Sequence, residues 1–141
     1  MVAGKDEAAA THSWDLSGRR VLVIDDEREI LDAMQTLLSK WGCEVVVAVS
    51  LDNAVSELSE KKIAPDLILS DLRLSDTDTG IDVLDSLRRQ FGESIPGILI
   101  TGETAPEQIE AARNSGYILL QKPVQPARLR TVIQHHLSTT L

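Results

Sequence analysis

RVLVIDD, residues 20–26, is the stretch of this sequence that decides the fold. A short run rich in β-branched side chains ends abruptly there in two adjacent aspartates. A continuous apolar run of this length is typical of a strand that is buried on both faces, as the strands of a parallel sheet are. We therefore predict a buried parallel strand over residues 20–24, with Asp25 and Asp26 at its carboxyl end.

The same pattern repeats from this segment to the end of the chain. Further strands are predicted at residues 43–49, 67–70, 98–100 and 117–120. Between them apolar residues recur at helical spacing, Ser50 stands where it can cap one helix, and Pro106 starts another. Five strands alternating with five helices predict an α/β fold with a parallel sheet covered on both faces. We expect the flavodoxin-like (βα)5 sandwich, with strand order 2-1-3-4-5.

The length and charge of the chain limit its number of domains and its kind of partner. Its 141 residues are enough for about one domain, and its formal net charge is −8. This acidic balance argues against nucleic acid or an anionic membrane as the main partner. No apolar stretch approaches the roughly 20 residues of a membrane span, and no signal-peptide pattern opens the sequence. We therefore expect a cytoplasmic location.

Residues 1–17 lack sustained periodicity, so we expect a flexible tail, a linker or an expression remnant there, followed by one folded domain over residues 18–141. The single cysteine, Cys43, lies in an apolar run and is interpreted as a buried, unreactive thiol. His135 and His136 are interpreted as the solvated end of the last helix rather than as phosphotransfer histidines.

The residues that can carry chemistry stand just past the predicted strands. Asp25 and Asp26 follow the first strand, Asp71 the third, Thr101 the fourth and Lys122 the fifth. In open α/β sheets, ligands bind outside the carboxyl ends of the strands, where the strand order reverses. In the expected order this point lies between the first and third strands, so the three aspartates should converge. Taken alone, Asp26 suits a helix cap as well as a metal site.

Three converging carboxylates repel one another unless a cation offsets their charge. At an effective dielectric constant of about 20, each close pair costs roughly 4 kcal/mol. Oxygen ligands suit Mg²⁺ or Mn²⁺, and no His or Cys neighbours these positions to favour zinc. Such a site can handle a phosphoryl group: the ion and Lys122 offset its charge, Thr101 donates a hydrogen bond and a carboxylate acts as nucleophile.

Four segments together resemble the motifs of response-regulator receiver domains, in the order and strand context of that family. They are VLVIDDE (21–27), LILSDLRL (67–74), GILITG (97–102) and LLQKPV (119–124). The resemblance covers about residues 19–137. It implies a phosphoacceptor domain of a two-component phosphorelay, whose donor is a histidine kinase or a histidine phosphotransfer protein. TGETAP and LLQKPVQPARLR also resemble the C-terminal receivers of hybrid histidine kinases.

The resemblance implies a role for each site residue. Asp71 is the phosphoacceptor. Asp26, Asp71 and the backbone carbonyl of Arg73 coordinate Mg²⁺, while Asp25 acts mainly through a bound water.

The resemblance also implies a switch. Thr101 turns toward the phosphoryl group, and Lys122, joined to Pro123 by a cis bond, pairs with the acceptor. Phosphorylation would then draw the Thr101 loop inward and reshape the face made by the fourth helix, the fifth strand and the fifth helix. Such receivers can dimerise weakly through this face.

The sequence departs from the common family pattern at three places. Leu119 holds the aromatic switch position, and the nearest aromatic, Tyr117, stands two residues earlier. Residues 74–75 are Leu-Ser instead of Met-Pro, in a loop that is one residue longer. Arg73 and Glu103 could pair across the mouth of the site, which predicts slow autodephosphorylation that an Arg73→Ala change would accelerate.

Two rival functions stay open. A haloacid-dehalogenase-like phosphohydrolase also uses Asp, Mg²⁺, Thr and Lys, but it needs an Asp-x-Asp after its first strand and a cap domain. A pseudo-receiver would share the fold and act only as a protein-binding module. Whether the chain counts as an enzyme stays open as well, because a receiver catalyses only its own phosphorylation and dephosphorylation and can be part of a hybrid kinase.

Overall fold

A computed structural model describes residues 16–74, 78–102 and 105–139. Five strands and five helices alternate along these residues. The strands are β1 (Arg20–Ile24), β2 (Glu44–Ala48), β3 (Leu67–Asp71), β4 (Gly97–Thr101) and β5 (Ile118–Gln121). The helices are α2 (Arg28–Lys40), α3 (Leu51–Lys61), α4 (Gly80–Phe91), α5 (Pro106–Asn114) and α6 (Pro126–Thr139).

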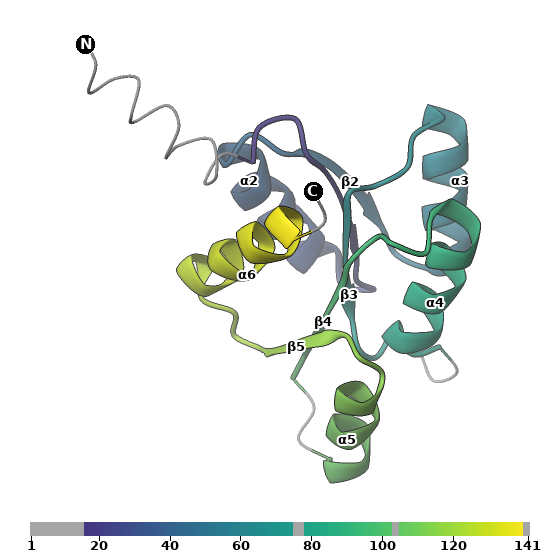
Figure 1. Cartoon of the computed structure of the whole chain (residues 1–141), viewed down its shortest axis with the longest axis vertical. Helices are drawn as coiled ribbons and strands as arrows, with labels where there is room; N and C mark the ends of the chain where they lie inside the picture. Colours follow the sequence, from purple (N-terminus) through teal and green to yellow (C-terminus); the bar gives the residue numbers. More distant parts are fainter. Residues whose placement is uncertain (1–15, 75–77, 103–104, 140–141) are drawn as a thin grey trace.

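The strands form one sheet in the order β2-β1-β3-β4-β5, and every neighbouring pair is parallel. In Figure 1 the helices α2 and α6 lie on one side of this sheet, and α3 and α4 lie on the other. The flavodoxin-like fold predicted from the sequence is therefore confirmed, strand order included. Because β1 and β3 are adjacent, their carboxyl ends meet at one point of the sheet edge.

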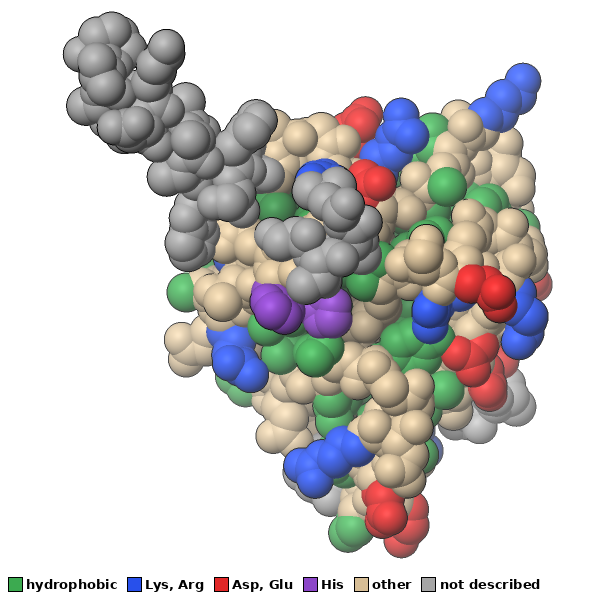
Figure 2. Space-filling model, in the orientation of Figure 1, with side chains coloured by type: hydrophobic (Ala, Val, Ile, Leu, Met, Phe, Trp, Pro, Cys, Tyr) green, Lys and Arg blue, Asp and Glu red, His purple; other side chains and the backbone are tan. Residues whose placement is uncertain are grey.

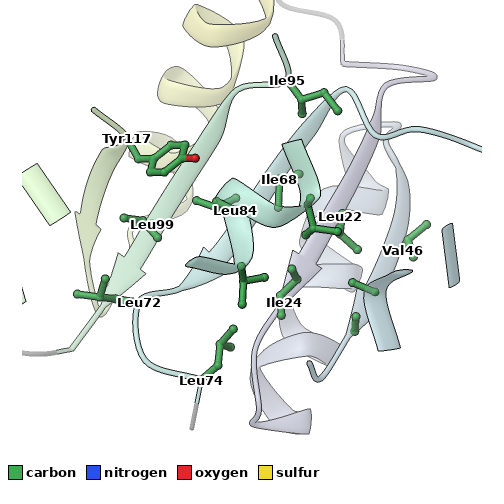
Figure 3. Packing of buried hydrophobic residues seen from close by; sticks show 14 of the residues in the cluster. Leu22, Ile24, Val46, Ile68, Leu72, Leu74, Leu84, Ile95, Leu99 and Tyr117 are labelled. Atoms are coloured by element: carbon green, nitrogen blue, oxygen red, sulfur yellow. The ribbon is translucent and has the colours of Figure 1, made fainter. Parts of the chain in front are cut away.

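Two apolar clusters hold the layers together, and β1 contributes to both. Leu22 and Ile24 belong to the cluster under α3 and α4, part of which Figure 3 shows, whereas Val21 and Val23 belong to the cluster under α2 and α6. Successive side chains of a strand point to opposite faces, so a strand covered by helices on both faces must be apolar at every position. This burial explains the uninterrupted apolar run that identified β1.

Two residues of chemical interest lie within strands and not in the loops after them. Asp71 is the last residue of β3, in register with Ile100, and Thr101 is the last residue of β4, in register with Gln121. The apolar runs predicted strands that end one residue earlier in each case. Backbone pairing continues past the last apolar side chain, and it holds both residues in the rigid edge of the sheet.

The structure also shifts three other predicted boundaries. The strand predicted at 43–49 is shorter, and the one predicted at 117–120 begins at Ile118, so Tyr117 precedes it. Leu16, which the sequence pattern placed in the tail, is only 2% exposed and belongs to the cluster under α2 and α6. The packed domain therefore includes residue 16, while residues 1–15 lie outside the described part.

Local signals for helix ends behave as predicted. Ser50 caps α3 by accepting a hydrogen bond from the Asn53 backbone N–H at 3.1 Å, and Pro106 occupies the first turn of α5. Ala112 is the one buried residue of α5, so this helix packs lightly on the sheet. Among the described residues, none of the helices is long and apolar enough to cross a bilayer.

The surface in Figure 2 mixes positive and negative side chains over α3 and α4. His135 and His136 lie near the end of α6, with their rings 5.9 Å apart in an edge-to-face arrangement. Burial, aided by the neighbouring His135, lowers the pKa of His136, so this residue is less readily charged than a fully solvated histidine.

The single thiol, Cys43, is 7% exposed and free, and burial raises its pKa to about 11 from an ordinary value of 9.0. At pH 8 this shift reduces the thiolate fraction about 100-fold. We expect iodoacetamide to alkylate the native protein at least about 100-fold more slowly than the unfolded protein, as measured by intact mass with and without guanidinium chloride. Equal rates would mean that Cys43 is accessible in the folded state.

Candidate functional site

Three aspartates converge at the carboxyl edge of the sheet. Asp25 and Asp26 follow β1, and Asp71 ends the neighbouring strand β3. One carboxylate oxygen from each residue lies within 4.8 Å of the others. The convergence predicted from the strand order is therefore confirmed.

The two adjacent aspartates differ in their surroundings. Asp25 is 3% exposed, and its Oδ1 accepts a hydrogen bond from the Glu27 backbone N–H at 2.9 Å. Asp26 is exposed. The interpretation of Asp26 as a helix cap is wrong, because Glu27 occupies the N-cap of α2 and makes no side-chain capping bond. One Asp26 carboxylate oxygen lies instead in the acidic cluster, within 4.8 Å of the oxygens of Asp25 and Asp71.

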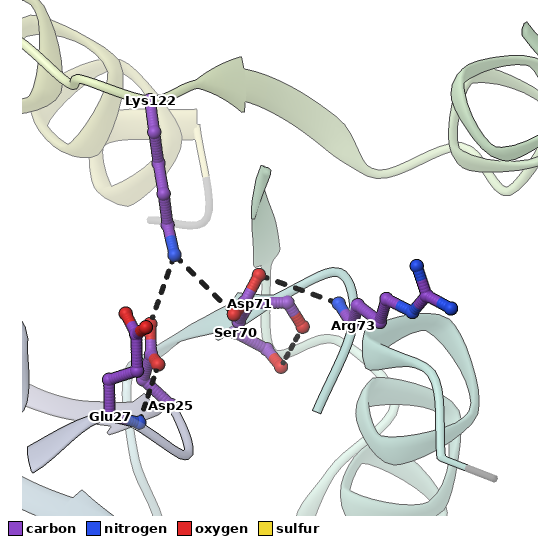
Figure 4. Close-up of polar contacts among 6 residues, drawn as sticks. All are labelled: Asp25, Glu27, Ser70, Asp71, Arg73 and Lys122. Carbon is purple, nitrogen blue, oxygen red and sulfur yellow. Dashed lines mark hydrogen bonds and ion pairs between the residues drawn. The ribbon is translucent and has the colours of Figure 1, made fainter. Parts of the chain in front are cut away.

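Lys122 joins two of these carboxylates. Its ammonium nitrogen lies 3.4 Å from Asp25 Oδ2 and 3.4 Å from Asp71 Oδ2 (Figure 4). The backbone N–H of Lys122 donates to the Thr101 carbonyl oxygen at 2.8 Å. This hydrogen bond holds the backbone of Lys122 against the end of β4. The bond from Lys122 to Pro123 is cis, as the family resemblance implied.

The surroundings of the cluster disfavour the charged forms of the Asp25 and Asp71 carboxylates. Burial raises the pKa of Asp71, although the Lys122 charge opposes this effect. Burial and the Asp71 charge together raise the pKa of Asp25. Burial works against the charge of Lys122, but the attraction of Asp71 and Asp25 outweighs it and raises the pKa of the lysine. One ammonium group therefore only partly offsets the repulsion in this site.

The acidic cluster is compatible with a divalent cation. Three carboxylates from two adjacent strands offer hard oxygen ligands within reach of one ion, and Mg²⁺ prefers such ligands. An ion there would offset charge that Lys122 leaves unbalanced.

Thr101 lies on β4, beside the strand that ends in Asp71. It is 1% exposed and ends β4, one residue beyond Ile100, the register partner of Asp71. Asp71 ends β3, Thr101 ends β4 and Lys122 directly follows β5, so the three side chains stand at the carboxyl ends of three neighbouring strands. This combination suits a phosphoryl group, which needs a nucleophile and donors for its oxygens.

The family model for the response regulator receiver domain matches residues 21–134. The chain belongs to this family. The receiver is 34% identical over 134 residues to the phyllosphere-induced regulator PhyR of Methylorubrum extorquens, which covers 94% of this chain and 48% of PhyR. It is 32% identical over 118 residues to an uncharacterized 14.6 kDa protein of Leptolyngbya boryana, covering 82% and 88% of the two chains.

Solved structures agree with this assignment. A CheY-like receiver domain protein from Methanospirillum hungatei superposes with a TM-score of 0.76 at 26% identity, covering 88% of this chain and 97% of the other. NtrX from Brucella abortus gives a TM-score of 0.76 at 30% identity and covers 87% of this chain but 27% of NtrX. The receiver therefore spans about half the length of PhyR and about a quarter of NtrX.

In the receiver, the described residues on either side of residues 75–77 pair with each other. Arg73 and Thr79 form an isolated antiparallel bridge, and the Leu74 backbone N–H donates to the Asp78 carbonyl oxygen at 3.2 Å. The Arg73 backbone N–H lies 3.4 Å from Asp71 Oδ1, while its side chain leads away from Asp71 in Figure 4. Glu103, its predicted partner, lies outside the described residues, so the predicted pairing stays a prediction.

Gly80, the first residue of α4, is a positioning residue. Its backbone N–H donates to the Leu72 carbonyl oxygen at 2.7 Å. A Cβ atom at Gly80 would lie 2.3 Å from the carbonyl oxygen of Asp71 and 2.8 Å from a methyl carbon of Leu99. Only glycine therefore lets the start of α4 pack this closely on the end of β3.

Tyr117, the aromatic residue just before β5, is held away from the carboxyl edge of the sheet where the acidic cluster lies. The Tyr117 hydroxyl donates to an Asp85 carboxylate oxygen and accepts from the Arg88 guanidinium at 3.3 Å, so it links the residue just before β5 to α4. Leu119, at the family's aromatic switch position, is partly buried and packs against the cluster under α3 and α4. No local pattern predicted the contacts of Tyr117, because its partners lie about 30 residues earlier in the chain.

Proposed function

We propose that this receiver accepts a phosphoryl group on Asp71 from a phosphohistidine donor and changes its partner-binding face in response. The observation that carries the proposal is the position of the Asp71 carboxylate. It ends β3, it lies 3.4 Å from the Lys122 ammonium, and it shares the acidic cluster with Asp25 and Asp26. Family membership supports the same role.

Each residue of the site has a place in the transfer. An oxygen of Asp71 attacks phosphorus, and the bond from phosphorus to the imidazole nitrogen of the donor breaks, with its electron pair left on that nitrogen. Lys122 offsets negative charge on the transferred group, and the Thr101 hydroxyl donates to one of its oxygens. The phosphoryl group is then bonded to the carboxylate of Asp71, at the end of β3.

Asp25, Asp26 and Asp71 are the side chains that would hold Mg²⁺ or Mn²⁺, together with the backbone carbonyl of Arg73. When bound, the ion supplies charge neutralisation for the incoming phosphoryl group. The raised pKa values of Asp25 and Asp71 fit this role, because a cation at this point would favour their charged forms.

The response would reach partners through the sheet edge. Movement of Thr101 toward a phosphoryl group pulls on β4 and its register partner in β5, and this motion reshapes the face of α5, β5 and α6. Because Leu119 replaces the aromatic switch and Tyr117 is held by Asp85 and Arg88, the response does not use an aromatic rotamer change. Weak homodimerisation through this face belongs to the same proposal.

The donor is a histidine kinase or a histidine phosphotransfer protein, and the compartment is the cytoplasm. Several relatives extend well beyond the matched region, so the receiver also fits as one domain of a longer regulator or of a hybrid histidine kinase. No direct contact with nucleic acid or membrane is part of the proposal.

Intact mass after incubation with acetyl phosphate tests the proposal. We expect one phosphoryl adduct on the native chain in the presence of Mg²⁺ and none without it or in Asp71→Asn. Asp52→Asn, an exposed change in the first turn of α3, is the matched control and should be phosphorylated normally. No adduct under any condition would favour the pseudo-receiver, and repeated hydrolysis of a generic phosphate ester would favour the phosphohydrolase.

A further inference from the structure

An apolar cavity of about 620 Å³ adjoins the acidic cluster. It lies between α2 and the segment that joins β5 to α6. Its walls are Val23, Leu69 and Ile100 from the sheet, Ile30 and Met34 from α2, and Val124 from the connecting segment. Its volume falls within the range of about 300–1,000 Å³ that is usual for small-molecule sites, which are mostly apolar with a few converging polar groups.

The polar groups of the cavity carry an excess of negative charge. Three carboxylates, those of Asp25, Glu29 and Asp71, line it together with one ammonium group, that of Lys122. The Lys122 ammonium is already shared between Asp25 and Asp71. Glu29 is exposed on the first turn of α2, and among the described residues it forms no ion pair. The rim therefore favours a positively charged group over a negative one.

We propose that this cavity binds a small amphipathic cation, an aryl- or alkylammonium molecule. Its apolar body lies between α2 and Val124, and its charged group pairs with the carboxylates at the rim. Burial of the body in the apolar walls supplies affinity, and the charge selects cations. An ammonium group and a divalent ion would draw on the same carboxylates of Asp25 and Asp71, so each weakens the binding of the other.

A ligand in this cavity would regulate the receiver in addition to phosphorylation. If the proposed function of Asp71 holds, occupancy of the cavity lowers phosphoryl acceptance by displacing the ion from the cluster. Binding itself does not depend on phosphorylation, so failure of one proposal is distinguishable from failure of the other.

Isothermal titration calorimetry with phenethylammonium tests the proposal directly. Phenylpropionate has a similar ring and the opposite charge, and ethylammonium has the charge without the ring. We expect both comparators to bind at least tenfold more weakly than phenethylammonium, and we expect added Mg²⁺ to weaken phenethylammonium severalfold. Absence of saturable phenethylammonium binding would overturn the proposal, and tighter binding of phenylpropionate would assign the cavity to an anion held by Lys122.

Two variants locate the binding. Val124→Phe fills the cavity and should weaken phenethylammonium at least tenfold, with circular dichroism to check that the variant folds. Glu29→Gln removes a charge from the rim at an exposed position, so it should fold normally and weaken binding about threefold. Asp32→Asn, an exposed change on the same helix outside the cavity lining, is the matched control and should bind normally. Equal affinity in all three variants would contradict the assigned site.

Discussion

Replacing Gly80 with alanine is expected to lower the free energy of unfolding by about 2–4 kcal/mol. The new methyl group would lie 2.3 Å from the backbone oxygen of Asp71, which cannot turn away as a flexible side chain can. The start of α4 and the end of β3 must separate to make room, at the cost of buried contacts such as the hydrogen bond from Gly80 to Leu72. Urea unfolding followed by circular dichroism measures the loss.

Two other glycines provide graded controls for this prediction. At Gly97 an added Cβ would lie 3.0 Å from methyl carbons of Leu84, a side chain that can shift, so Gly97→Ala should cost less than Gly80→Ala. At Gly102 the nearest atom of a described residue other than its chain neighbours would be 4.0 Å away on Lys122, so Gly102→Ala should change stability by less than about 0.5 kcal/mol. Equal stability of the Gly80 and Gly102 variants would refute the steric account.

Opposite changes in divalent-ion affinity are expected from two single substitutions at the acidic cluster. Asp26→Asn removes an oxygen ligand with its charge and should weaken Mg²⁺ or Mn²⁺ binding at least about tenfold. Lys122→Met removes the cation that lies 3.4 Å from two of the carboxylates, and it should strengthen ion binding severalfold. Calorimetric titration of the purified variants with Mg²⁺ or Mn²⁺ measures both changes in affinity and needs no phosphorylation step.

The opposite signs make this pair a sharp test. Asp52→Asn lowers the net negative charge by the same amount as Asp26→Asn but lies in the first turn of α3, so it should leave the affinity nearly unchanged. If Lys122→Met weakened ion binding instead, the lysine would be needed to hold the carboxylates in position. A loss in Asp52→Asn as large as that in Asp26→Asn would show that general charge, and not the cluster, attracts the ion.

The predicted strand ends show what local sequence patterns can and cannot predict. Asp25, Asp71, Thr101 and Lys122 could be placed at the carboxyl edge because apolar runs stop there, and a parallel sheet brings all such ends to one edge. The same signal missed that Asp71 and Thr101 still belong to β3 and β4, since backbone pairing does not depend on the polarity of the last side chain.

The sequence by itself determined the fold class, the expected strand order and the polar residues at the strand ends, because apolar runs and the polar residues that end them are patterns within short stretches of chain. Only the tertiary structure decided which charged groups of the site pair and how closely its segments pack. Lys122 bridges Asp25 and Asp71, which stand 97 and 51 residues before it, and Gly80 meets the backbone of Asp71. The cavity beside the cluster exists only because α2 and the segment before α6 leave a gap over the sheet. These features come from packing between distant segments, which no local pattern encodes.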